Sequence, residues 1–264
     1  MNELTPIQLG HVNWIGLKTL IKKECARFLN VGAQTILTPV VTSVLFYMVF
    51  SLAFGGNGRS IGDIPYMTFL APGLIMMSMI QNAFSNTSST LMIAKIQGNI
   101  VDILMPPLMP LELLTGLLIG GVLRGLIIGA LGCVTLSYFA GFSVVHIWAV
   151  VFYSVAGCMA LALLGIIAGV WSEKFDHLAT FTNFIIMPLT FLSGTFYAVS
   201  QLPPIWLEVA MYNPFFFVID GFRYGLLGQH EASIIRGVII MLVVNIGLFS
   251  VTLNMIRKGY KIKS

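Results

Sequence analysis

Long apolar stretches separated by short polar connections make up most of this chain. A helix that spans a bilayer needs roughly 20 consecutive, mostly apolar residues. Six stretches meet this requirement, at approximately 34–54, 65–86, 111–139, 145–171, 179–199 and 234–256. The pattern therefore predicts an all-α membrane protein with six transmembrane helices, the first of them an uncleaved anchor because no compact signal-peptide core precedes it.

The region 202–228 is almost as apolar as the six spans, but we expect it not to cross the membrane. Three prolines and three charged residues interrupt it: Pro203, Pro204, Pro214, Glu208, Asp220 and Arg223. A charge near the centre of a spanning helix costs about 2.5–3.5 kcal/mol on insertion scales. We predict two short re-entrant helices in the outer leaflet, with Asp220 and Arg223 meeting as an i,i+3 pair on one helical face.

The N-terminal segment has the pattern of a basic amphipathic helix. Apolar residues recur at helical spacing on one side: Trp14, Leu17, Ile21 and Phe28. Basic residues occupy much of the other side and precede the first span: Lys18, Lys22, Lys23 and Arg27. Such a helix lies along the inner leaflet, each basic residue contributing about 1 kcal/mol against anionic lipid. It can serve as a topological anchor, as a contact for a cytoplasmic subunit, or as both.

The connection after the second span, KIQGNIVDILMPPLMPLEL at residues 95–113, predicts another amphipathic helix. One apolar stripe follows i, i+4, i+7, i+8 spacing: Ile96, Ile100, Ile103 and Leu104. Polar residues lie elsewhere on the same helix: Lys95, Gln97, Asn99 and Asp102. Pro106, Pro107 and Pro110 forbid the helix from continuing beyond Met105. The segment can act as a rigid lever on the third span, or it can be a loop helix that rests on lipid headgroups.

Composition and charge place this pattern in a membrane. The chain is 57% hydrophobic and 9% charged, whereas soluble domains average about 25% charged residues. With six spans, ten of the 14 basic residues fall on the side that holds both termini and residues 95–113. The Lys/Arg-rich side of a membrane protein is cytoplasmic. We therefore expect both termini and this connection to face the cytoplasm.

Sequence signals for catalysis and for cofactors are weak. No GxxxxGK[ST] loop occurs, so the chain has no Walker loop to cradle ATP phosphates. The four histidines are scattered, without cysteine or carboxylate partners at ligand spacing, which argues against a metal site. We expect a chain that is not an enzyme, that binds no cofactor or metal, and that has no nucleic-acid partner.

Two features of the third span have more than one interpretation. Gly121, Gly125 and Gly129 follow the spacing that lets helices approach closely in lipid, either inside one chain or between two copies. Arg124 lies roughly 13 residues into the span, where a charge suggests a role in lining a path. It can instead reach towards cytoplasmic water or bind backbone carbonyls. No acidic residue lies deep in another span to pair with it.

The chain resembles the membrane subunits of the ABC type-2 exporters, which include multidrug and polysaccharide exporters. Four parts carry the resemblance and cover nearly the whole chain in the expected order: the amphipathic N-terminal helix before six spans, GNIVDILMPPLMPLELL (98–114), LSGTFYAVSQLPPIW (192–206) and NPFFFVIDGFRYGLLG (213–228). The sequence departs from many relatives where the segment KIQGNIVDIL carries only Lys95 and Asp102 as charges. A specific salt bridge to an ATPase is therefore in doubt.

The resemblance implies three parts: an interface helix at 1–33, a six-span domain at 34–256 and a basic cytoplasmic tail at 257–264. It implies that residues 95–107 dock into an ATPase as a coupling helix, through Lys95, Ile96, Gln97, Gly98, Ile100, Asp102, Leu104, Pro106 and Pro107. It suggests a path or gate at Phe46, Tyr47, Phe50, Arg124, Phe191, Asn213, Pro214, Asp220 and Arg223. Aromatic belts at the membrane surface explain some outer aromatic residues equally well.

These features predict the permease subunit of an ABC exporter in a bacterial inner membrane. The expected partners are two copies of an ATPase subunit that holds ATP and Mg²⁺, a second permease copy in a homodimer, and the bilayer itself. The expected substrate is amphipathic, lipid-linked or a saccharide. One alternative is a stand-alone transporter coupled to an ion or solute, although such proteins use ionisable residues near the midplane. Another is a non-transporting assembly or scaffold protein.

Overall fold

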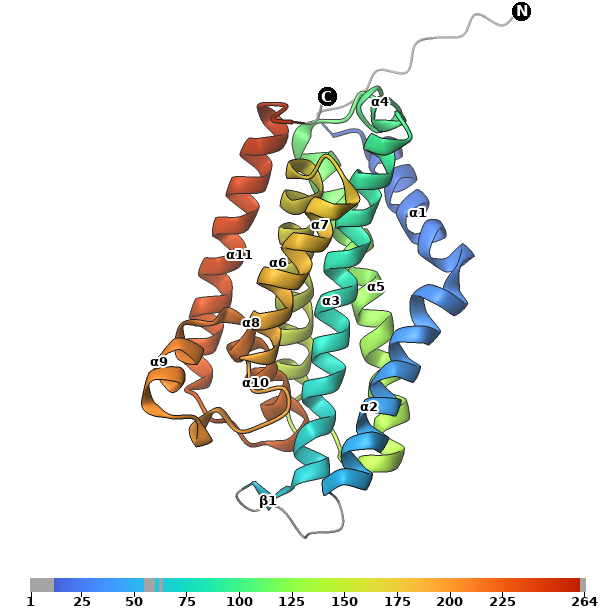
Figure 1. Cartoon of the computed structure of the whole chain (residues 1–264). Helices are drawn as coiled ribbons and strands as arrows, with labels where there is room; N and C mark the ends of the chain where they lie inside the picture. Colours follow the sequence, from blue (N-terminus) through green and yellow to red (C-terminus); the bar gives the residue numbers. More distant parts are fainter. Residues whose placement is uncertain (1–11, 55–59, 62–63, 262–264) are drawn as a thin grey trace, which may run out of the picture.

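The computed structural model describes residues 12–54, 60–61 and 64–261, and these form a helical bundle (Figure 1). The helices named α are α1 (Trp14–Asn30), α2 (Thr38–Phe54), α3 (Tyr66–Ile96), α4 (Ile100–Leu104), α5 (Pro110–Ala140), α6 (Ile147–Trp171), α7 (Phe175–Phe181), α8 (Met187–Phe191), α9 (Pro204–Tyr212), α10 (Pro214–Leu227) and α11 (Ile234–Arg257). The remaining elements are the π turns η1 (Ala33–Leu37) and η3 (Thr182–Ile186), the 3-10 turn η4 (Val199–Gln201), and a hairpin of β1 (Ser60–Ile61) and β2 (Ile64–Pro65).

Helix α3 is the centre of the bundle and packs against α2, α5, α6 and α10. Close approach depends on glycines in α5 and α6. A Cβ atom at Gly125 would lie 2.6 Å from the Cys158 sulfur, and one at Gly165 would lie 2.5 Å from the Phe84 carbonyl oxygen. The glycine series of α5 therefore serves packing inside one chain, one of the two interpretations that its spacing allows.

Among the described residues, five helices are long and apolar enough to span a membrane: η1–α2 as Ala33–Phe54, and α3, α5, α6 and α11. The remaining apolar stretch, the fifth in chain order and expected at 179–199, is instead a chain of three pieces, α7, η3 and α8, whose helical part ends at Phe191. Gly194, with φ of +73°, belongs to the irregular segment that follows. The architecture is all-α and membrane-embedded, and the sixth crossing stays a prediction.

Both π turns stand immediately before an X-Pro pair. In η1 the Thr38 N–H bonds to the Ala33 carbonyl, one residue before Pro39, and in η3 the Met187 N–H bonds to the Thr182 carbonyl, one residue before Pro188. A proline inside a helix lacks the N–H for the carbonyl four residues earlier and collides with it. Widening the helix by a π turn relieves this collision.

Helix α1 packs along α5 (Figure 1). The side that it buries there is not the predicted apolar side of Trp14, Leu17, Ile21 and Phe28. The residues buried on α1 are Leu20, Glu24 and Phe28, whereas Trp14 is 63% exposed. A Cβ atom at Gly120 would lie 2.7 Å from the Glu24 Cβ, so the missing side chain makes room for α1. Glycines of a distant helix therefore select which side of α1 is buried.

The helix expected over residues 95–105 is shorter in the structure. Lys95 and Ile96 are the last residues of α3, Gly98 turns the chain with φ of +74°, and α4 holds only Ile100–Leu104. Left-handed backbone of this kind favours glycine and ends the helix. The expected apolar stripe is therefore divided: Ile100 is buried, while Ile96 is exposed.

Two short helices, α9 and α10, occupy the region 202–228, and Asn213 separates them. Both lie towards the end of the bundle that carries the β1–β2 hairpin. Helix α4, the start of α1 and the end of α11 lie at the opposite end (Figure 1). Most of α9 is exposed and most of α10 is buried. We call these two ends the hairpin end and the α4 end.

Candidate functional site

A single carboxylate organises the α4 end. Glu112 is buried, and its two oxygens accept hydrogen bonds from the backbone N–H of Asn13 and of Met109, each at 2.7 Å. Asn13 also donates from Nδ2 to the Pro107 carbonyl at 3.2 Å. The start of α1, the proline segment and the start of α5 are thereby joined. Sequence reasoning missed Glu112, although a Glu at the third position of a helix that starts with proline is a capping signal.

Lys95 does not project outward from the α4 end. Its ammonium group donates to the carbonyl oxygens of Val170 and of Ser172, the latter at 3.2 Å. Val170 lies in the last turn of α6 and Ser172 directly follows that helix, at the end where the helix dipole favours a cation. Lys95 thereby ties α3 to the end of α6, and its expected coupling role stays a prediction.

The other expected coupling residues divide by exposure. Ile96, Gln97, Gly98, Asp102, Pro106 and Pro107 are exposed, Ile100 is buried beneath them, and the side chain of Leu104 lies outside the described part of the structure. Exposed apolar side chains surround α4: Ile96, Val101, Met105 and Met109. We call these four residues the α4 tip. Apolar residues grouped at one end of a bundle are typical of a contact surface.

The basic residues of α1 also divide. Lys18, Lys22 and Lys23 are exposed, whereas Arg27 turns inward to α3. Arg27 Nη2 lies 3.2 Å from Glu24 Oε2, 2.9 Å from the Asn86 carbonyl oxygen and 3.0 Å from Asn86 Oδ1. Arg27 thus fastens α1 to α3 and does not extend the exposed row of lysines.

A polar face runs along α3. Its members recur at helical spacing and are at least partly exposed: Ser78, Gln81, Asn82, Ser85 and Ser89. Most other residues of α3 are buried. In Figure 1, α3 runs down the front of the bundle with α1 and α2 on one side and α7 and α8 on the other. A polar, uncovered face on a membrane helix indicates contact with water, a polar ligand or another chain.

Arg124 reaches this face from α5. Its Nη2 donates to Asn82 Oδ1 at 2.9 Å and to the Thr35 carbonyl oxygen at 3.4 Å. Thr35 lies four residues before Pro39, which has no N–H to offer that carbonyl. The Arg124 side chain therefore links α5 to both α3 and η1. Its contact with a backbone carbonyl is one of the alternatives that the sequence left open.

The expected path aromatics separate in space. Phe50 stacks on Phe196 with ring centroids 5.3 Å apart, and Phe191 stacks on Phe196 at 5.5 Å. Tyr47 is buried and lies 6.4 Å from Phe139, while Phe46 is exposed. A cavity of about 390 Å³ adjoins Phe196 at the hairpin end, lined by Phe54, Ser60, Ile61, Tyr66, Phe196, Tyr197 and Gln201. Phe50 and Phe191 therefore converge near this cavity.

The expected Asp220–Arg223 pair does not form. Asp220 accepts from the N–H groups of Glu231 and Ala232, at 2.9 and 3.0 Å. Arg223 donates to the Gly194 carbonyl at 2.8 Å, lies 3.7 Å from Glu231 Oε1, and places its guanidinium 3.6 Å from the centre of the Phe69 ring. Residues far along the chain supplied better partners than the neighbour one turn away.

Asn213 and Pro214 connect this cluster to α8. Asn213 Oδ1 accepts from the Phe215 N–H at 3.0 Å and caps α10, and its Nδ2 donates to the Leu189 carbonyl at 2.7 Å. Pro214 is the first residue of α10, where its missing N–H costs nothing. Asn213 therefore ties α8 to the start of α10.

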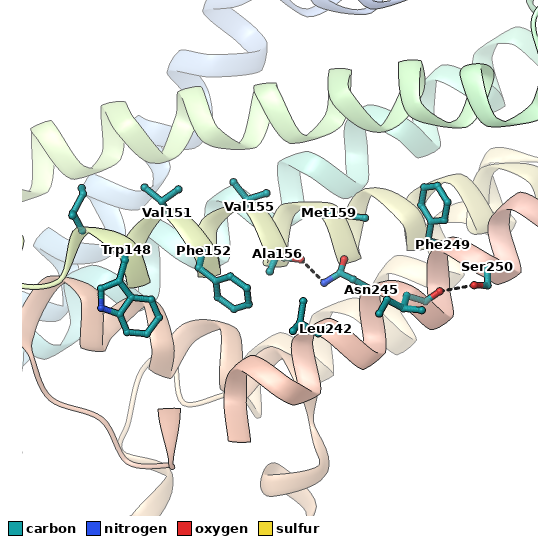
Figure 2. Close-up of a pocket in the computed structure, with 12 residues that line it drawn as sticks. Trp148, Val151, Phe152, Val155, Ala156, Met159, Leu242, Asn245, Phe249 and Ser250 are labelled. Carbon is teal, nitrogen blue, oxygen red and sulfur yellow. Dashed lines mark hydrogen bonds between the residues drawn. The ribbon is translucent and has the colours of Figure 1, made fainter. Parts of the chain in front are cut away.

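A further hollow lies elsewhere, between α6 and α11, with a volume of about 930 Å³. Figure 2 shows Trp148 and Phe152 on α6 facing Leu242 on α11, and the Asn245 amide donating to the Ala156 carbonyl at 3.1 Å. Its walls are almost wholly apolar. Such a groove suits the hydrocarbon chains of a bilayer, and its polar lining is limited to Asn245 and Ser250.

Spanning helices and a polar face on the central one define a multi-pass helical membrane protein. The chain belongs to the family described as ABC-2 type transporter, whose sequence model matches residues 16–227. It is 34% identical over 255 residues to the inner membrane transport permease YadH of Escherichia coli K12, covering 96% of this chain and 99% of that protein. It is 22% identical over 224 residues to nodulation protein J of Neorhizobium galegae, covering 83% of each chain.

Proposed function

We propose that this chain is the permease subunit of an ABC exporter in a bacterial inner membrane, driven by a separate ATP-hydrolysing subunit. The observation that carries the proposal is the α4 tip. Its four apolar residues are exposed, and Glu112 joins the adjacent proline segment to both α1 and α5. Family membership supports a partner ATPase for this surface.

The proposed topology has six crossings, with α7–η3–α8 as the fifth and α9–α10 as re-entrant outer helices. The α4 end then faces the cytoplasm, in accord with the basic residues near it. The parts expected at 1–33 and 257–264 include residues 1–11 and 262–264, which lie outside the described residues. A second permease copy covers the polar face of α3, and two ATPase copies hold ATP and Mg²⁺.

In the proposed mechanism, closure of the two ATPase subunits on ATP pushes the α4 tip. The Pro106–Pro107 segment and the Glu112 carboxylate pass this motion to α1 and α5 together. The flanking segments η1–α2 and α7–η3–α8 shift against α3, and Asn213 carries the shift of α8 to α10. A path then opens along α3 towards the hairpin end for an amphipathic, lipid-linked or saccharide substrate.

The test replaces two residues of the α4 tip, Val101→Asp and Met105→Asp together, in the full chain expressed with its ATPase. Burying two carboxylates in an apolar contact is expected to lower ATPase co-purification by at least about tenfold. The matched control is Ile205→Asp on α9, which is 76% exposed at the opposite end and should leave co-purification unchanged.

Two results would count against the proposal. Equal recovery of the ATPase with the tip variant would show that the α4 tip is not the contact. Transport by the purified chain alone, driven by a proton or ion gradient, would favour a secondary transporter instead.

A further inference from the structure

The cation Arg124 lacks a counter-ion within the described residues, where no carboxylate lies within 4 Å of it. Its protein partners are the neutral oxygens of Asn82 and Thr35. A second cation, Arg27, binds Asn86 on α3, one turn from the Asn82 that Arg124 binds. Arg27 has Glu24 as its ion-pair partner, so the group of two arginines and one glutamate keeps one positive charge in excess.

The same place is also rich in unused hydrogen-bond donors. Three buried nitrogens have no partner: Arg27 Nε, Asn86 Nδ2 and Arg124 Nε. They lie on adjacent turns, since Asn82 and Asn86 are one turn apart on α3, and Gly120 and Arg124 are one turn apart on α5. A Cβ atom at Gly120 would lie 3.6 Å from Asn86 Nδ2. Each of these unused groups is a donor, which raises the positive potential of the region.

The guanidinium is held in place yet open on one side. Asn82 Nδ2 donates to the Ser78 carbonyl at 2.9 Å, which leaves its Oδ1 to accept from Arg124 Nη2. Arg124 Nη1 has no hydrogen-bond partner among the described residues and is not among the buried atoms. An anion can therefore approach Nη1 without displacing a protein group. The chain on either side of Thr35 exposes apolar side chains: Val31, Leu37 and Val41.

We propose that Arg124 binds the anionic headgroup, a phosphate or a carboxylate, of an amphiphilic molecule whose hydrocarbon chain lies against η1 and α2. A charge-assisted bond to a positioned arginine is stronger than one between neutral groups. Arg27 adds to the attraction, and Asn82 and Thr35 position the guanidinium. The further assignment of this site as the entry point of the transported substrate rests on the proposed exporter function.

The binding test uses the full chain in detergent, without an ATPase, and phosphatidylglycerol and phosphatidylethanolamine as probes. Retention of each lipid is measured by native mass spectrometry. The wild-type chain should retain phosphatidylglycerol in preference to phosphatidylethanolamine, and Arg124→Gln should lower that preference by about tenfold, the effect of one charge-assisted bond. Arg124→Lys should retain most of it, and Arg236→Gln, an exposed residue of α11, should retain all of it.

Equal preference in wild type and Arg124→Gln would overturn the proposal. Rescue by Arg124→Lys excludes misfolding as the cause of a loss. A second arm places the chain with its ATPase in vesicles and measures ATP hydrolysis with and without phosphatidylglycerol. If phosphatidylglycerol stimulates ATP hydrolysis by the wild type and Arg124→Gln abolishes that stimulation, the entry assignment is supported. If Arg124→Gln loses retention but the wild type shows no stimulation, the entry assignment is overturned and the bound lipid has a structural role. Failure to recover an ATPase at all would contradict the exporter function but not the lipid-binding proposal, because the retention measurement needs no ATPase.

Discussion

The three central helices α3, α5 and α6 differ from the flanking segments η1–α2 and α7–η3–α8 in the way they achieve stability. The central helices meet through glycines whose absent side chains admit a neighbouring backbone or side chain. The flanking segments each contain a π turn before a proline and expose much of their apolar surface. We call α3, α5 and α6 the frame. The frame is closely packed, whereas the helical hydrogen-bonding pattern of the two flanking segments is interrupted at their π turns.

This difference assigns different tasks to the two regions. Close packing resists deformation, because small shifts in a dense core lose many contacts at once. A π turn beside proline has fewer helical hydrogen bonds to break, and such turns are frequent at functional sites. We expect substitutions in the frame to change stability and substitutions in the flanking segments to change transport.

The largest effect on stability is expected from Gly165→Ala in the frame. The added methyl group would lie 2.5 Å from the Phe84 carbonyl oxygen, so a backbone must shift. Overpacking of this kind costs about 1–3 kcal/mol, measurable as a lower midpoint of thermal unfolding in detergent. Gly247→Ala on α11 is the matched control, because a Cβ atom there meets nothing within 4 Å. Equal midpoints for the two variants would break the comparison.

A smaller effect is expected from Glu112→Gln, which tests the joint between α1 and the frame. The amide of Gln keeps one acceptor oxygen. One of the two bonds to the N–H groups of Asn13 and Met109 is therefore lost, and the other is no longer assisted by a negative charge. We expect about 1 kcal/mol of lost stability and a weaker coupling of ATP hydrolysis to transport. The ratio of substrate moved to ATP hydrolysed checks this. An unchanged ratio would show that α1 and α5 do not move together.

The smallest effect on stability is expected from Pro188→Ala in a flanking segment. The new N–H can serve the carbonyl four residues earlier and lets η3 relax towards a regular α-helix. The unfolding midpoint should stay equal or rise slightly, while the transport rate falls several-fold because the segment has lost its irregular turn. Pro204→Ala, at the first turn of the exposed helix α9, is the control for proline removal alone. A fall in midpoint with transport intact would reverse the assigned tasks.

Local signals in the sequence predicted the elements well where one chain segment decides the outcome. The stretches at 65–86, 111–139, 145–171 and 234–256 each lie largely within one long helix, and the prolines of 202–228 divide two short ones. The segment 95–105 was predicted as one helix, because the periodicity of Ile96, Ile100 and Ile103 outweighed the single Gly98 that turns the chain.

The site was less predictable, since its contacts join residues distant in sequence. Lys95 was expected to face a partner and binds the end of α6. Arg223 was expected to meet Asp220 and lies near Glu231, which no periodicity linked to it. Glu112 was overlooked although its capping position was readable. The spacing of charges along one helix cannot reveal which of several helices comes near.

The sequence by itself determined that this chain is a multi-pass helical membrane protein and that the prolines of 106–110 and 203–214 stand at helix boundaries. Hydrophobic length and missing N–H groups act within one segment, so no tertiary information is needed. Only the tertiary structure decided which side of α1 is buried, which oxygens each cation binds and which guanidinium group stays open. These outcomes depend on distances between helices, and those distances are set by the packing of glycines and side chains across the whole bundle.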